Sequence, residues 1–518
     1  MINIDGIQKL RLQVQWQRLL AIVEEQAQAL LRTSFSTIVR ECGDLSCGIF
    51  DPVGRMLAQA VTGTPGHVNT MGDSVGHFLR LFPADSMRDG DVYITNDPWM
   101  GTGHLNDFVV VTPFFKQGQL VALFCSTSHI MDVGGLGYGP DGRDVFMEGF
   151  CVPPVKFAER NVINDTLMQV IKANTRLPSE TEGDLYSLVN SNEVGRRSLL
   201  AMMDEFEGEN LEALADYIVS ATHAAALKQL ADLPQGSFTH RMTVDGYEEA
   251  VELVATLSIS ATGLNVDFAG SSKPSMFGIN VPLSYAAAYS TFAMMSALLP
   301  AIPNNSGSLS LFSVSAPKDS ILNAARPAPV AIRHVLGQML PDVVFGCLRQ
   351  VVPDKVPAEG ASCLWNINLR GMDQKGQGFS TTVTTNGGTG ARPGKNGLSV
   401  TSYPSGVRGT PIEILEAAIP AVFWKKQIVE GSGGTGLWRG GDGVELSIEN
   451  TSPKDMTLLA AFDRVKFAAR GVEGGGDGAK GFVGIENGRV LKAKGSQSFE
   501  PGERLLIRTP GGGGLGRA

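Results

Sequence analysis

The distribution of apolar and polar residues predicts a helical start to the chain. Over residues 5–39 apolar residues recur near helical spacing, which predicts one long amphipathic helix or two. Gly43-Asp44 ends this region. Short elements are expected next, in the order strand 45–50, turn 51–54, strand 55–60, loop 62–67 and helix 73–82.

The clearest strand pattern lies just after this region. A strand is expected at 91–95, followed by a loop at 96–104. Two runs rich in Val, Phe and Leu, at 108–115 and 120–127, flank a stretch at 116–119 that has the composition of a tight turn. These runs predict a β-hairpin.

The rest of the chain divides into helical and strand-rich stretches. Helices are expected at 163–174, 180–230, 283–299 and 335–350, and strands at 240–246, 250–258, 263–268, 361–370, 443–449 and 455–462. The tail from Gly511 to Gly516 is either an ordered loop or a frayed end. The pattern predicts a mixed α+β, multi-domain body. Its expected domains are an N-terminal region with the hairpin at 1–237, a central region at 238–360 and a Gly-rich, β-dominated region at 361–518.

Composition is typical of a folded globular protein, with 43% hydrophobic and 18% charged residues. The net charge is −9 and no stretch concentrates Lys and Arg, which argues against nucleic acid as a partner because phosphate binding needs clustered positive charge. The 62 glycines among 518 residues are well above the average share of about 7%. They predict many turns and close approaches between backbones.

The sequence also argues against a membrane or secretory location. Polar residues such as Arg11 and Arg18 interrupt the apolar positions of the first helix, so no signal peptide is expected. No stretch reaches the roughly 18 consecutive apolar residues of a membrane span. The six cysteines form no CxxC pair, which favours reduced thiols in a cytoplasmic protein.

Two His-x-x-Asp units flank the predicted hairpin, His104-Leu-Asn-Asp107 and His129-Ile-Met-Asp132. With the turn centred in 116–119, position 107 would pair with 128 and position 104 with 131. All four ligand-type side chains are therefore expected at the open end of one hairpin.

Two imidazoles and two carboxylates in one place favour a divalent cation. Without a cation the carboxylates would repel each other and the imidazoles would lack partners. Zn²⁺, Mn²⁺ and Fe²⁺ all accept mixed His and Asp ligation, and an open position in such a site is typical of water activation. The alternative is a pair of His–Asp hydrogen bonds that close the hairpin without metal. Asp44, which opens another hairpin, is a further candidate ligand on the weaker ground of spacing alone.

Other apparent motifs carry less information. Gly72-Asp-Ser-Val-Gly76 matches a nucleophile elbow but lacks a preceding strand. Gly431–Gly436 matches G-x-G-x-x-G but is not followed by a helix, and no P-loop pattern occurs, so ATP is expected to bind elsewhere. Structural or surface roles are expected for the other histidines, with Arg333-His334 the least typical of such a role: His67, His77, His223, His240 and His334.

Three motifs around the hairpin are distinctive in combination: Asn96-Asp-Pro-Trp-Met-Gly-Thr-Gly-His-Leu-Asn-Asp107, His129-Ile-Met-Asp-Val-Gly-Gly135 and Glu148-Gly-Phe-Cys-Val-Pro-Pro154. Shorter motifs extend from Arg32-Thr-Ser-Phe35 to the Pro510-Gly-Gly-Gly-Gly tail. Together they resemble the hydantoinase B/5-oxoprolinase B family over almost the whole chain.

This resemblance implies a metal-binding subunit that works with a separate A-type subunit. The A-type subunit would bind ATP and phosphorylate the amide or enolate oxygen of the substrate, in a hetero-oligomer such as α2β2. The resemblance implies His104, Asp107 and His129 as metal ligands, with Asp44 as the fourth. Asp132 would be a catalytic residue that orients a ligand or the attacking water.

The resemblance implies one of two activities. The first is ATP-dependent opening of cyclic amides such as hydantoins, 5-oxoproline or lactams. The alternative is ATP-dependent carboxylation of ketones such as acetone or acetophenone. A third hypothesis, a non-catalytic scaffold for the ATP-binding subunit, predicts that replacing His104 or His129 leaves activity intact.

Overall fold

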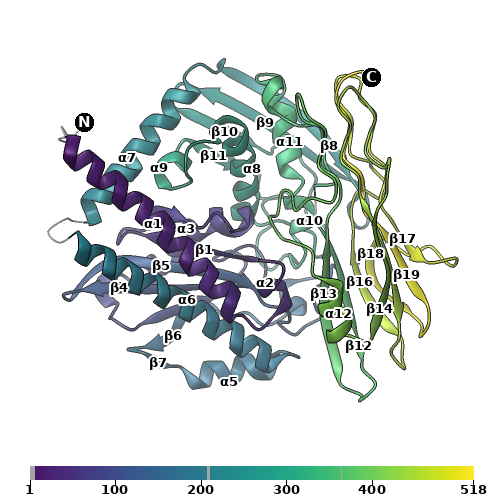
Figure 1. Ribbon diagram of the computed structural model, residues 1–518, viewed down its shortest axis with the longest axis horizontal. Coiled ribbons are helices and arrows are strands. Elements are labelled where there is room, and N and C mark those ends of the chain that lie inside the picture. Colours follow the sequence, from purple (N-terminus) through teal and green to yellow (C-terminus); the bar gives the residue numbers. More distant parts are fainter. Residues whose placement is uncertain (1–5, 207–210, 363) are drawn as a thin grey trace.

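The computed structural model describes residues 6–206, 211–362 and 364–518. Helices and several separate sheets share the chain, which confirms the predicted mixed α+β, multi-domain fold. In Figure 1 the N-terminal helices and their sheet lie at one end, and the C-terminal strands lie at the other.

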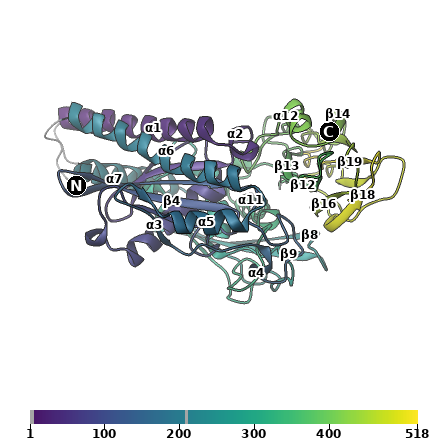
Figure 2. The same cartoon turned by 90° about the horizontal axis from the view of Figure 1, so that it is seen from below.

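A seven-stranded sheet forms the N-terminal part. From one edge to the other its strands are β2 (Met56–Gln59), β1 (Leu45–Phe50), β5 (Gln119–His129), β4 (Asp107–Lys116), β3 (Val92–Thr95), β6 (Val155–Glu159) and β7 (Val162–Ile163). Helices α1 (Gly6–Thr33) and α6 (Pro178–Glu205) cover one face, and α3 (Pro65–Leu81) covers the other. Figure 2 shows these three layers edge-on.

Burial on both faces explains why β4 is apolar at almost every position. Phe108, Val110 and Phe114 lie in the cluster that includes α1 and α6. Val109 and Val111 lie in the cluster that includes α3. Because successive side chains of a strand point to opposite faces, a strand covered on both sides needs apolar residues throughout.

The central part joins a four-stranded sheet to two buried helices. Its strands, in sheet order, are β11 (Phe312–Ser315), β10 (Gly263–Asp267), β9 (Val251–Ser260) and β8 (Gly236–Val244). Helix α11 (Leu340–Leu348) packs on β8 and β9, and α8 (Leu283–Leu298) packs on both α11 and α3. Across the described ranges, no helix combines the length and hydrophobicity needed to cross a bilayer.

Two four-stranded sheets form the C-terminal part, and their apolar side chains belong to one buried cluster. The first has β13 (Gly378–Thr385), β12 (Trp365–Met372), β16 (Met456–Ala461) and β18 (Lys494–Phe499), and the second has β14 (Ala421–Ile428), β15 (Val444–Asn450), β19 (Arg504–Arg508) and β17 (Phe482–Ile485). The remaining elements are the 20-residue helix α7 (Leu211–Leu230) and shorter ones: α2 (Thr37–Arg40), α4 (Val145–Glu148), α5 (Asp165–Asn174), α9 (Ser306–Leu309), α10 (His334–Gly337), α12 (Ile412–Ala418) and 3-10 turns at Ala84–Ser86 and Pro353–Lys355.

The glycine-rich tail is an ordered, buried segment, the first of the two alternatives expected for it. Gly512 donates its amide hydrogen to the carbonyl of Gly441, and Gly513 donates to that of Glu359. A Cβ on Gly512 would lie 2.0 Å from the carbonyl oxygen of Thr389. Glycine is therefore required here because backbone packs directly against backbone.

Several predicted boundaries are corrected. Helix α3 begins at Pro65, so the second half of the expected loop at 62–67 and the gap before 73 are helical. Pro is favourable in the first turn of a helix, whereas Gly66 and Gly72 weaken the apolar pattern that would have revealed it. The predicted helix at 180–230 is two helices, α6 and α7. The three domain ranges remain a prediction.

Candidate metal centre

The hairpin of β4 and β5 brings two of the expected ligands directly opposite each other. Asp107 pairs with His129, and not with position 128 as predicted. The difference arises at a β-bulge, where Phe114 pairs with Ala122 and Phe115 with Leu120. One extra residue on β5 shifts every pair beyond it. Directly paired residues point to the same face, so the shift places both ligands on one side.

The carboxylate of Asp107 is the centre of the cluster. Its Oδ1 lies 2.7 Å from Nε2 of His104 and 3.2 Å from Nδ1 of His129. Its Oδ2 lies 2.9 Å from Nε2 of His67 and 2.6 Å from Nη2 of Arg333. Burial alone would raise the pKa of Asp107, but the charges of His67 and Arg333 beside Oδ2 help to hold it well below its usual range.

The tautomer of His104 makes this cluster suitable for a cation. Its Nδ1 donates to the carbonyl of Ala331 at 2.9 Å, and burial lowers its pKa to about 3, so Nε2 carries no hydrogen. That bare nitrogen faces a carboxylate oxygen of Asp107 at 2.7 Å, an arrangement of two lone pairs. A divalent ion between them would turn this repulsion into two bonds.

Two more imidazole nitrogens of the neighbouring histidines are buried. Nε2 of His129 and Nδ1 of His67 have no hydrogen-bond partner among the residues that the structure describes. Ligand atoms from His104, Asp107 and His129 all lie within 4.8 Å of one another. Nitrogen and carboxylate donors at this separation fit a metal such as Zn²⁺, Mn²⁺ or Fe²⁺.

Asp44 lines the same cavity as these three residues. Its Oδ1 is 3.7 Å from Nε2 of His67, and its backbone carbonyl accepts a hydrogen bond from the amide of His129. Burial raises the pKa of Asp44, while His67 and His129 oppose the rise. The cavity measures about 20 Å³, which is room for one ion or water but not for a ring.

Asp132 points away from the histidines. Its Oδ1 accepts from Nη1 of Arg176 at 2.6 Å, and its Oδ2 accepts from the backbone amide of Arg176 and the hydroxyl of Thr175. The side chain therefore fixes the turn that follows the hairpin. A role in orienting a ligand or water stays a prediction.

Sequence reasoning missed most of the cavity wall, including its remaining ionisable residues nearest the hairpin: His67, Tyr138, Arg333 and His334. The ring of Tyr138 packs 4.9 Å from that of His129, and its hydroxyl is 3.1 Å from Nδ1 of His334. His67 comes from the first turn of α3, and Arg333 and His334 come from the start of α10. In the sequence, the only feature that set any of these residues apart was the unusual Arg333-His334 pair.

The other singled-out residues lie outside the cavity. His77 contacts Arg80, His223 contacts Ser310 and His240 contacts Arg470. Ser74 of the G-x-S-x-G match is inside α3 and donates to a helix carbonyl, so it is no nucleophile elbow. Gly431–Gly436 is followed by a loop and not by a helix.

Glu148 supports the metal centre through the backbone. Its Oε1 accepts from the amide of Ala331, whose carbonyl in turn accepts from His104. Burial raises the pKa of Glu148 to about 8, and its Oε2 has no hydrogen-bond partner among the described residues. The buried carboxyl of Glu148 thus holds the turn before α10, whose Ala331 carbonyl fixes the tautomer of His104.

The variant Glu148→Gln is expected to remove a loss of stability that occurs as the pH rises from about 4.5 to about 8. The folded chain keeps a proton on this side chain up to about pH 8, whereas the unfolded chain releases it near 4.5. Between these values the wild type loses about 1.4 kcal/mol of stability for each pH unit gained. Urea unfolding at several pH values measures this slope. Glu205→Gln, at an exposed position, is the control, and equal slopes for wild type and Glu148→Gln would contradict the assignment.

The chain is similar to known proteins over almost its whole length. A family model described as hydantoinase B/oxoprolinase matches residues 8–518. The chain belongs to the hydantoinase B/oxoprolinase family. Within this family it is 28% identical to 5-oxoprolinase 1 of Arabidopsis thaliana over 96% of this chain and 41% of the relative. It is 26% identical to caprolactamase subunit beta of Pseudomonas jessenii, over 95% of this chain and 88% of the relative. The chain thus spans less than half of the 5-oxoprolinase.

Two solved structures share the fold of this hydantoinase B/oxoprolinase family member. The ATP-dependent caprolactamase from Pseudomonas jessenii has a TM-score of 0.90 at 24% identity, over 99% of this chain and 92% of that one. The nucleotide-free structure of acetone carboxylase has a TM-score of 0.86 at 19% identity, over 98% of this chain and 76% of that one.

Proposed function

We propose that this chain is the metal-binding subunit of an ATP-dependent enzyme that opens cyclic amides such as hydantoins, 5-oxoproline or lactams. The observation that carries the proposal is the contact between the bare Nε2 of His104 and the carboxylate of Asp107. It supports a resident divalent ion at the end of the hairpin. The names of relatives, 5-oxoprolinase and caprolactamase, support a cyclic amide as substrate.

The proposed partner is an A-type subunit that binds ATP and phosphorylates the amide oxygen, in a hetero-oligomer such as α2β2. Phosphorylation makes the carbonyl carbon electrophilic, which an unstrained amide needs before water can attack. The name "subunit beta" of the caprolactamase supports a second chain, and the description of its structure as ATP-dependent supports the energy source.

The proposed metal ligands are Asp44, His104, Asp107 and His129, and a bound Zn²⁺, Mn²⁺ or Fe²⁺ would lower the pKa of water towards about 7. The surrounding residues act on the ligands. Arg333 and His67 occupy Oδ2 of Asp107, which leaves Oδ1 for the ion. The carbonyl of Ala331 keeps Nε2 of His104 free of hydrogen.

A ketone carboxylase is the second candidate. The observation that favours it is the TM-score of 0.86 to acetone carboxylase over nearly the whole chain. In that case an enolate phosphorylated by the partner would react with CO₂ near the same ligands. The two candidates share a site and differ in the second substrate.

The deciding experiment uses this chain in complex with an ATP-binding partner subunit. The complex is given ATP with hydantoin, 5-oxoproline or caprolactam, and separately with acetone or acetophenone and bicarbonate. We expect ADP release that depends on an amide and a ring-opened product detected by mass spectrometry. Turnover that needs ketone and bicarbonate would replace the first proposal by the second, and no turnover with either class would reject both.

A further inference from the structure

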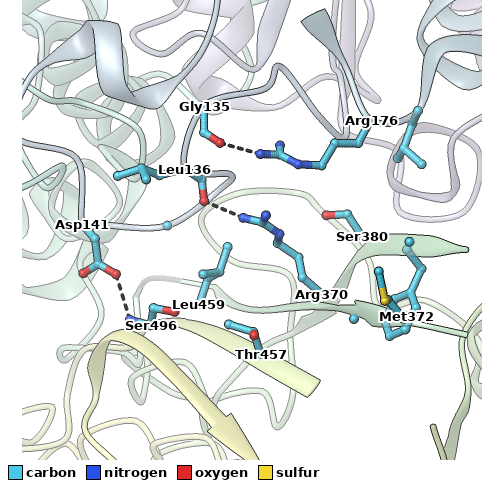
Figure 3. Close-up of a pocket in the computed structure, with 15 residues that line it drawn as sticks. Gly135, Leu136, Asp141, Arg176, Arg370, Met372, Ser380, Thr457, Leu459 and Ser496 are labelled. Carbon is cyan, nitrogen blue, oxygen red and sulfur yellow. Dashed lines mark hydrogen bonds between the residues drawn. The ribbon is translucent and has the colours of Figure 1, made fainter. Parts of the chain in front are cut away.

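A second cavity lies on the other side of the loop that follows the hairpin. It has a volume of about 690 Å³ and lies between residues 135–141, Arg176 and the outer face of the sheet formed by β13, β12 and β16. Figure 3 shows the guanidinium groups of Arg176 and Arg370 reaching the same loop, at Gly135 and Leu136. We refer to this cavity as the arginine cleft.

We propose that the arginine cleft binds an oxyanion, a phosphate or a carboxylate group, between Arg176 and Arg370. A guanidinium presents N–H groups in a planar fork that matches both of these groups. The cleft is distinct from the histidine cavity, and none of the proposed metal ligands lines it.

Arg370 forms no ion pair within the described part of the chain, and its Nη1 donates to the carbonyl of Leu136 at 2.6 Å. Burial, and secondly the nearby charge of Arg176, lower its pKa. The carboxylate of Asp132 acts on Arg370 only from beyond ion-pair distance, where it opposes the fall in the pKa of this guanidinium. A half-buried cation beside a second cation gains stability from an anion that both can contact.

The guanidinium of Arg176 forms an ion pair with Asp132, which uses only part of its five N–H groups. Its Nη1 lies 2.6 Å from the carboxylate of Asp132, and its Nη2 donates to the carbonyl of Gly135 at 2.5 Å. The other carboxylate of the cleft, Asp141, accepts from the hydroxyl of Tyr247 and the amide of Ser496. Asp141 is thus hydrogen-bonded to other groups at the opposite end of the cleft. The two guanidinium groups stay accessible to a ligand.

Neutral donors surround Arg370 on the floor of the cleft. Ser380 pairs with Arg370 across β13 and β12, and Thr457 pairs with it across β16 and β12. Residues directly opposite each other share one sheet face, so both hydroxyls flank the guanidinium. Ser380 and Thr457 both line the cavity. Hydroxyl donors beside a guanidinium are suited to the several oxygens of one oxyanion.

Glycine at 137 keeps the cleft open to Arg370. It has a φ of +86°, and a Cβ there would lie 2.7 Å from Nη1 of Arg370. Any side chain would therefore displace the guanidinium. The next residue, Tyr138, packs its ring 5.6 Å from the ring of His104. An anion in the arginine cleft would sit one loop away from the metal centre.

Isothermal titration calorimetry tests the proposal with sodium phosphate and sodium acetate as probes, at constant ionic strength maintained with sodium chloride. We expect the wild type to bind at least one probe and Arg370→Met to bind it about 10- to 100-fold more weakly. Phosphate binding alone would identify a phosphate group, acetate binding alone a carboxylate, and binding of both the shared chemistry.

Two further variants show whether weaker binding by Arg370→Met comes from the lost guanidinium or from misfolding. Ser380→Ala keeps both charges and is expected to weaken binding by about 2- to 10-fold. Arg197→Met removes an exposed arginine of α6 that pairs with Glu193, and it is expected to bind like the wild type. The proposal is overturned if the wild type binds neither probe, or if Arg370→Met and Ser380→Ala both bind as tightly as Arg197→Met.

Discussion

Replacing His104 or His129 by alanine is expected to abolish stoichiometric binding of a divalent ion and to lower ATP-dependent turnover by on the order of 10³-fold. Each variant removes one nitrogen from a cluster whose ligand atoms lie within 4.8 Å of one another. A bound ion would stabilise the charge that develops on the attacking water by several kcal/mol. A variant that cannot hold the ion loses this activation.

His223→Ala is the matched control for these variants. His223 lies on α7 and contacts Ser310, away from the hairpin. Elemental analysis of the purified proteins measures the metal, and steady-state assays of the complex with its partner measure turnover. Equal metal content in all three variants would remove the metal centre from the mechanism. Full activity in His104→Ala would favour the hypothesis of a non-catalytic scaffold.

Arg464→Met is expected to lower the free energy of unfolding by about 3–5 kcal/mol. The guanidinium of Arg464 is buried between two carboxylates, 3.3 Å from Asp342 and 3.0 Å from Glu359. Methionine fills part of the space but leaves both acids without their main counter-charge, and burial penalises an unpaired charge heavily. Urea unfolding followed by fluorescence measures the change.

An exposed arginine gives the comparison. Arg489→Met breaks an ion pair with Glu503 at the surface, where solvent screens the charges, and is expected to leave the unfolding midpoint almost unchanged. If both variants shifted the midpoint equally, the buried network around Arg464 would have no special weight in stability.

The clustering of His104, Asp107 and His129 could be predicted because its signal is local. Apolar runs define β4 and β5, and the His-x-x-Asp units stand at their ends. The register was wrong by one residue because a bulge depends on packing and leaves no composition signal. His67 and Arg333 could not be predicted, since they reach Asp107 across 40 and 226 residues of sequence.

The C-terminal sheets were predicted least well. Strand β18 reads Lys-Gly-Ser-Gln-Ser-Phe, and its one large apolar residue gives no alternation to detect. It pairs with β16 through backbone hydrogen bonds that any residue but proline can supply. Where pairing rather than side-chain burial defines a strand, the hydrophobic pattern carries little information.

The buried glycine tail has a consequence for the response of the protein to temperature. Around Gly512 the contacts are between peptide groups, so unfolding there would expose polar backbone and few apolar side chains. Exposure of polar surface lowers the heat capacity of unfolding, whereas exposure of apolar surface raises it. The backbone-packed segment around Gly512 should therefore lose less stability on cooling than the aliphatic core does. In hydrogen–deuterium exchange it should behave as a slowly exchanging unit, although it is built from the residue with the greatest backbone freedom.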